Sequence, residues 1–138
     1  WAGQLSPEDY ARFALPYEQK IFEGINRKSA PAILFINGCG TFLKKMASCG
    51  ADVLSVDWRV DLAEARRAVG DRLTLQGNLD PCVLLSNPDV VREKAVEVLK
   101  QGGGRRHILN LGHGILPPTP VENARAFIEA AKSGLRQV

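Results

Sequence analysis

The chain has 138 residues, enough for one domain with a hydrophobic core; 45% of its residues are hydrophobic and 24% are charged. This composition excludes an intrinsically disordered chain, and no apolar run approaches the roughly 18 residues needed to cross a bilayer. The formal net charge of +3 is mild and the paired arginines are isolated, so neither membrane nor nucleic acid is an expected partner.

The first predicted element is a helix that starts at Ser6 and Pro7, with serine as the cap and proline in the first turn, and continues to about Arg27. Pro16 should kink or divide this helix because proline lacks the N–H group that the helix ladder needs. The apolar residues recur at steps of three and four and predict one buried face, formed by Tyr10, Phe13, Tyr17, Ile21 and Ile25.

Four short apolar runs follow, and each is typical of a buried strand. They are expected at residues 32–36, 52–56, 73–75 and from Ile108 to the Gly112-His113-Gly114 turn. Each run is followed by a helical pattern. The helices are expected at residues 41–48, from Asp61 to Gly70, from Asn87 to the glycines at 102–104, and from Thr119, with Asp61, Asn87 and Thr119 as their starts.

Strands that alternate with helices predict a parallel sheet covered on both faces, in a single domain over residues 1–138. Four β/α units are also half of an eight-stranded barrel. The residues alone leave a half barrel and a small open doubly wound sheet as alternatives. A chain that opens on Trp1 favours a fragment of a longer protein.

The three cysteines, Cys39, Cys49 and Cys82, show no CxxC spacing and cannot all pair within one chain. They are interpreted as reduced and mostly buried thiols of a cytosolic protein. The chain has no Walker sequence, no dinucleotide-binding glycine pattern, no Gly-x-Ser-x-Gly elbow and no His-Glu-x-x-His helix.

Polar side chains are expected at the carboxyl ends of the strands, where parallel α/β folds bind ligands. The expected rim residues are Asn37, Asp57, Gln76, Asn78, Asn110 and His113. These side chains could bind a polar substrate, or they could cap helices and join loops. His113 is the strongest candidate because its two glycine neighbours leave the imidazole accessible. His107, beside two arginines, is expected on the surface.

Residues 75–81 (Leu-Gln-Gly-Asn-Leu-Asp-Pro) and 110–114 (Asn-Leu-Gly-His-Gly) closely resemble the carboxyl-terminal half of uroporphyrinogen decarboxylase. Residues 1–7, 14–17 and 56–58 do so as well, and the resemblance covers the whole chain in unbroken order. It implies the carboxyl-terminal half of a TIM (β/α)8 barrel without cofactor or metal, in a cytoplasmic enzyme that is usually a homodimer. The amino-terminal half of the same enzyme would be a partner.

The resemblance implies a carboxy-lyase that removes carbon dioxide from the four acetate arms of uroporphyrinogen III, giving coproporphyrinogen III for haem and chlorophyll synthesis. His113 matches the family's substrate-binding histidine. The family's aspartate, arginines and tyrosine have no counterpart in this chain, and its binding serine would stand immediately before Trp1. The catalytic residues of this chain are therefore unknown, and the isolated chain is expected to be inactive.

Two alternatives remain open at this stage. Zinc-dependent corrinoid/thiol methyltransferases of the same superfamily have a similar fold, and Asn37, Cys39 and His113 stand where their ligands would be. Only Cys39 is a ligand of the same type, whereas zinc needs three protein donors, so no metal is expected. The second alternative is a half barrel without catalytic activity.

Overall fold

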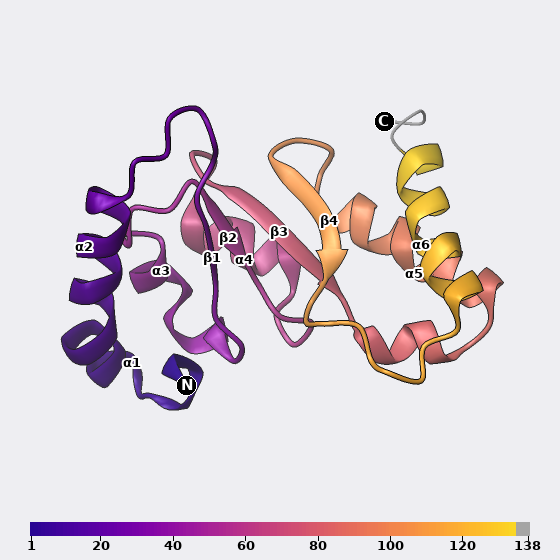
Figure 1. Cartoon of the computed structure of the whole chain (residues 1–138), viewed down its shortest axis with the longest axis horizontal. Helices are drawn as coiled ribbons and strands as arrows, with labels where there is room; N and C mark the ends of the chain where they lie inside the picture. The colour runs from indigo at the N-terminus through magenta and orange to yellow at the C-terminus, as the bar shows by residue number, and fades with distance from the viewer. Residues whose placement is uncertain (135–138) are drawn as a thin grey trace.

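The computed structural model describes residues 1–134, which form one parallel four-stranded sheet with connecting helices (Figure 1). The strands are β1 (Ile33–Phe35), β2 (Val53–Ser55), β3 (Thr74–Leu79) and β4 (His107–Leu111). They lie in the order β1-β2-β3-β4. A doubly wound sheet reverses its order at a switch point, whereas a β/α barrel adds its strands consecutively. The chain is therefore half of a TIM-type barrel. The last part of the predicted domain, residues 135–138, lies outside the described residues.

Local capping chemistry defines the starts of three helices, and the first predicted cap, Ser6, accepts a hydrogen bond from Asp9 N. The helices are α1 (Pro7–Asp9), α2 (Leu15–Gly24), α3 (Leu43–Met46), α4 (Leu62–Val69), α5 (Pro88–Gln101) and α6 (Val121–Gly134). Asp61 accepts a hydrogen bond from Glu64 N, and Asn87 accepts from the two N–H groups that open α5, which confirms both predicted caps. The predicted Thr119 cap is wrong: its hydroxyl is buried without a hydrogen-bond partner among the described residues.

The hydrophobic core lies between the sheet and the helices. Leu54 of β2 and Val56, directly after β2, belong to this core together with Leu62 of α4 and Val91 of α5. Each of these side chains is at most 1% exposed. Successive side chains of a strand point to opposite faces, so those of Val53 and Ser55, on either side of Leu54 in the sequence, point to the other face of the sheet.

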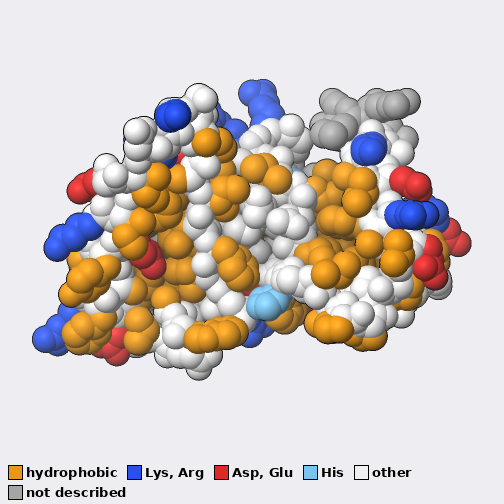
Figure 2. Space-filling view, in the orientation of Figure 1, with side chains coloured by type: hydrophobic (Ala, Val, Ile, Leu, Met, Phe, Trp, Pro, Cys, Tyr) orange, Lys and Arg blue, Asp and Glu red, His pale blue; other side chains and the backbone are white. Residues whose placement is uncertain are grey.

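That other face of the sheet is not covered by any helix of residues 1–134, so the predicted two-sided cover is wrong. Ile33 and Phe35 of β1 and Ile108 of β4 are 44%, 42% and 39% exposed. The reason is the strand order: when strands are added in one direction, right-handed crossovers place every helix on the same face. Figure 1 looks onto the open face, and Figure 2 shows apolar side chains gathered on it.

The first helical segment is divided ahead of Pro16, as predicted, but its apolar face is not buried as predicted. A π-helical turn at Tyr10–Ala14 precedes α2, and the extra residue of such a turn rotates everything after it about the helix axis. Tyr10 is buried and stacks on Phe42 at 4.3 Å between ring centroids. The side chains of the predicted face that remain exposed are Phe13, Tyr17, Ile21 and Ile25. No helix of the described chain is long and apolar enough to span a membrane.

Candidate functional site

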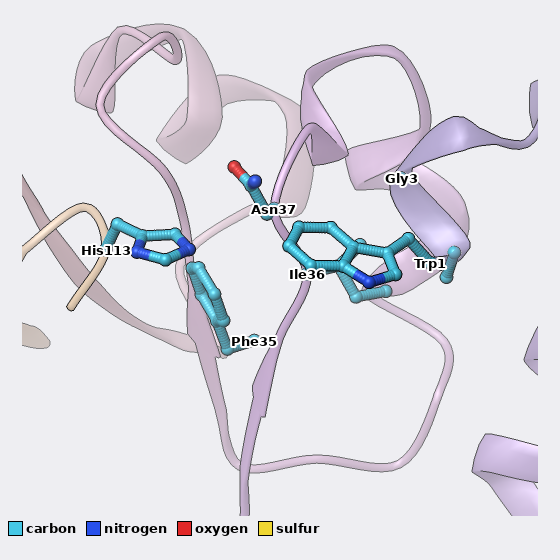
Figure 3. A pocket seen from close by; sticks show the side chains of 7 residues that line it. Trp1, Gly3, Phe35, Ile36, Asn37 and His113 are labelled. Carbon is cyan, nitrogen blue, oxygen red and sulfur yellow. The ribbon is translucent and has the colours of Figure 1, made fainter.

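Two adjoining hollows lie at the carboxyl ends of the strands and share Phe35 and His113. The smaller, of about 230 Å³, also has Asn37 and Trp1 in its wall, as Figure 3 shows. The larger, of about 410 Å³, extends along the open face of the sheet. Its other lining residues are Ser55, Gln76, Asn110, Leu111, Gly114 and Ile115. The candidate site is therefore a largely apolar surface with a few polar groups, open toward the uncovered face.

His113 projects into this site from the loop after β4 and is exposed. Its ring is edge-on to Phe35 at 5.9 Å and to Trp58 at 6.2 Å between ring centroids. These two aromatic side chains restrict where the imidazole can lie. No hydrogen bond from the described residues occupies either ring nitrogen, so both are available to a ligand. This arrangement places the imidazole where a ligand can reach it, and the role of His113 in substrate binding stays a prediction.

The two glycines that flank His113 serve different purposes. A Cβ atom on Gly112 would lie 2.3 Å from Trp58 N, which the backbone of the neighbouring loop does not permit. Its own N–H donates to Leu79 O at 2.7 Å. A Cβ atom on Gly114 would meet nothing within 4 Å. Gly112 is thus required for close approach of two loops, and Gly114 leaves space beside the histidine.

Asp57 and Asn78, which the sequence placed on the rim, join loops instead of facing the site. Asp57 is buried and accepts hydrogen bonds from Gly38 N, Arg59 N and Arg59 Nε. Burial alone would raise the pKa of Asp57, but these hydrogen bonds outweigh it and hold the pKa below its ordinary value. Asn78 Nδ2 donates to Asp57 O at 2.9 Å and to Val60 O at 2.5 Å.

Three further rim predictions reach the site, although two of them lie inside strands. Gln76 is within β3 and Asn110 within β4, not beyond the strand ends, and both line the larger hollow. Gln76 Nε2 donates to Ser55 Oγ at 3.1 Å. Asn37 lines the smaller hollow and accepts a hydrogen bond from Arg59 Nη2. The site therefore gathers four of the six predicted residues: Asn37, Gln76, Asn110 and His113.

His107 is half-buried, so the prediction of a surface residue is wrong. It is the first residue of β4, and its Nε2 lies 2.7 Å from Gly77 O. A carbonyl oxygen only accepts, so Nε2 carries the proton. Burial lowers the pKa of His107, and the charge of Arg66 acts in the same direction. Gly102 packs against the ring, since a Cβ there would lie 2.1 Å from His107 Nδ1.

Arg59 adjoins the site through its hydrogen bond to Asn37, and sequence reasoning missed it. It follows Asp57 and Trp58 in the loop after β2, and its guanidinium carbon lies 4.8 Å from the centroid of the Trp58 ring. Its position two residues after a predicted rim aspartate was the available signal.

Cys39 is the one residue that matches a ligand type of the zinc-dependent methyltransferases. Cys39 is completely buried, and burial raises its pKa to about 11. Within residues 1–134 no three His, Cys, Asp or Glu side chains group as metal ligands would. Cys49 is buried like Cys39, and Cys82 is exposed, so the prediction that most of the thiols are buried is confirmed.

Comparison with known proteins identifies the chain's relatives. Residues 1–134 match the family model described as uroporphyrinogen decarboxylase (URO-D). The chain is 49% identical to the uroporphyrinogen decarboxylase of Prochlorococcus marinus (strain NATL1A), over 96% of this chain and 38% of that protein. It is 48% identical to that of Nostoc punctiforme, over 96% and 38%.

A solved structure, a methyltransferase from Methanosarcina mazei, superposes on the chain with a TM-score of 0.81 at 29% identity, over 94% of this chain and 38% of that one. The chain thus spans less than two fifths of the length of the curated relatives it matches. Because the family match extends over every described residue, the chain belongs to the uroporphyrinogen decarboxylase family.

Proposed function

We propose that this chain forms part of the substrate cleft of an enzyme that decarboxylates uroporphyrinogen III to coproporphyrinogen III in porphyrin biosynthesis. The observation that carries the proposal is His113, held between aromatic side chains at the rim, with neither ring nitrogen hydrogen-bonded within residues 1–134. The family membership supports the reaction, since the relatives are named uroporphyrinogen decarboxylases. Residues 1–138 would be a single domain, the carboxyl-terminal half of that barrel.

The reaction converts each acetate arm into a methyl group. Protonation of the pyrrole ring makes it an electron sink, the bond to the carboxylate breaks, and its electron pair moves into the ring as carbon dioxide leaves. The exocyclic carbon then takes up a proton and the ring releases one, so each arm consumes one proton. This chemistry needs no cofactor. His113 carries an N–H donor in either protonation state, which suits binding of a substrate carboxylate.

The uncovered apolar surfaces support a protein partner for this chain. Ile33, Phe35 and Ile108 on the sheet, together with Tyr17 and Ile21 on α2, are each 39–64% exposed. Exposed apolar patches of this kind mark interaction sites. We assign them to the amino-terminal half of the same enzyme, which would supply the carboxylate and basic groups that catalysis needs. The complete enzyme would be a cytoplasmic homodimer.

A chimera tests the reaction. This chain would replace the matched segment of the Prochlorococcus marinus relative, and turnover of uroporphyrinogen III would be followed by separating products according to carboxylate number. We expect turnover by the chimera and none by the isolated chain. A folded but inactive chimera would contradict the proposed reaction, and turnover by this chain alone would contradict the need for a partner.

The role of His113 is tested in the same chimera. His113→Ala should raise KM or increase the fraction of partly decarboxylated products, because one contact to a substrate carboxylate is lost. Gln101→Ala, an exposed change near the end of α5, is the control and should leave the kinetics unchanged. Kinetics for His113→Ala that equal those of the unmodified chimera would remove the role.

A further inference from the structure

The carboxyl-end loops of this chain contain very few positive charges. They comprise residues 36–42, 56–61, 80–87 and 112–120, and Arg59 is the one lysine or arginine among them. The substrate of the proposed function has eight carboxylates, and such groups are recognised by cations and N–H donors. Among the lysines and arginines, Arg59 is therefore the candidate on the described rim for binding a substrate carboxylate. Its surroundings decide whether its N–H groups are available.

The guanidinium of Arg59 is held firmly along one edge. Nε donates to Asp57 Oδ1 at 3.2 Å, and Nη2 donates to Asn37 Oδ1 and is 3.4 Å from Asp57 Oδ2. A guanidinium has five N–H donors in a rigid plane. Among the described residues Nη1 has no partner, and the side chain is 55% exposed. A charge that is already oriented, with donors left over, loses little conformational freedom when it binds a ligand.

The partner carboxylate does not block this free edge. The Asp57 side chain is only 1% exposed and already accepts hydrogen bonds from Gly38 N and Arg59 N. Its negative charge therefore lies beneath the guanidinium, and the part of the pair that reaches solvent is the cation. A ligand approaching the rim meets N–H donors and not the carboxylate.

Trp58 links Arg59 to His113. Its ring lies 4.8 Å from the guanidinium carbon and 6.2 Å from the centre of the imidazole, so the two groups are separated by at most about 11 Å. Resting on the proposed function, we propose that Arg59 binds a second carboxylate of the substrate through its Nη1 edge. Arg59 and His113 then hold two acidic arms of one tetrapyrrole, with Trp58 between them as an apolar surface.

Binding of porphyrins to the chimera tests this assignment independently of turnover. The probes are uroporphyrin, which has eight carboxylates, and coproporphyrin, which has four, and protein fluorescence quenching reports both affinities. Arg59→Gln should weaken uroporphyrin binding about 3- to 10-fold, as expected for loss of a partly exposed charge-assisted hydrogen bond. Coproporphyrin should lose less, and Arg59→Lys should recover part of the affinity.

Two controls separate ligand binding from loop support. Arg67→Gln removes an exposed arginine of α4, 3.9 Å from Glu64, and should change neither affinity. Asp57→Asn loosens the loops but keeps the cation, so it should not weaken uroporphyrin binding more than coproporphyrin binding. Unchanged uroporphyrin affinity in Arg59→Gln, or equal loss for both porphyrins in Arg59→Gln and Asp57→Asn, would overturn the assignment. A chimera that neither binds nor turns over porphyrinogen would refute the proposed function, and this inference with it.

Discussion

Replacing Gly112 by alanine should destabilise the chain, whereas the same replacement of Gly114 should not. Both glycines flank His113, and neither has a positive φ, so the difference depends on space alone. The new Cβ at residue 112 would lie 2.3 Å from Trp58 N and 2.9 Å from Trp58 Cα. These are backbone atoms and cannot rotate away as a flexible side chain could.

The size of the effect follows from two contributions. Overpacking of this kind costs about 1–3 kcal/mol, and separation of the loops would also weaken the hydrogen bond from Gly112 N to Leu79 O, worth about 0.5–1.5 kcal/mol. We expect a loss of about 2–4 kcal/mol, a large part of a typical stability of about 5–15 kcal/mol. Gly114→Ala should be neutral or up to about 1 kcal/mol stabilising, since alanine restricts only the unfolded chain.

Urea unfolding followed by circular dichroism measures both variants, and equal m-values would show that the same transition is compared. Porphyrin binding by the chimera gives a second readout, because displacement of Trp58 also displaces an aromatic neighbour of His113. A Gly112→Ala variant as stable as the unmodified chain would refute the steric argument. Equal destabilisation by both substitutions would show that flexibility of the turn, and not the loop contact, matters.

Two further predictions concern pH. Because the pKa of Asp57 is lowered, its ionised form stabilises the fold above about pH 4, and this contribution is lost as pH falls further. Asp57→Asn should lower the free energy of unfolding by about 1–3 kcal/mol at pH 7, and the difference between the two proteins should become smaller in acid. A difference that stays constant to pH 3 would contradict this. His107 has a lowered pKa, so the unfolded chain takes up a proton below about pH 6.5 that the folded chain does not, and stability should fall from pH 7 to pH 5. His107→Gln, which keeps an N–H donor for Gly77 O, should reduce that loss of stability. An equal loss in the variant and the unmodified chain, measured by urea unfolding, would contradict the role of His107 in the pH dependence.

The features that the sequence predicted well depend on chemistry within a few residues. Asp61 and Asn87 cap their helices through N–H groups two or three residues away, and such contacts are legible in any short segment. The strand ends were less accurate because Gly77 and Asn78 are residue types that usually indicate a turn. Asn78 is instead held inside β3 by carbonyl groups 18 and 21 residues earlier in the chain. No local pattern contains that information.

The candidate site divides in the same way. His113 could be predicted because the glycines beside it and the end of an apolar run lie within the same few residues. Asp57 was expected on the rim for a similar reason, but its carboxylate turns toward Gly38 N in the loop after β1. Arg59 follows from that contact: once Asp57 is buried beneath it, the arginine becomes the exposed member of the pair. Whether Asp57 or Arg59 faces solvent thus depends on a contact between two loops.

The exposed stripe on α2 and the open face of the sheet have one physical explanation. Apolar residues at helical spacing indicate that a face is buried somewhere in the complete protein, and they do not specify by what. Here Tyr17 and Ile21 remain exposed, as do Ile33 and Phe35 on the sheet, although each belongs to a regular apolar pattern. Burial is worth about 25 cal/mol per Å² of apolar surface, so a partner that covers both surfaces would gain several kcal/mol from each. Such a partner would also close the side of the site on which His113 and the larger hollow are open, so stability and substrate enclosure would come from the same contact.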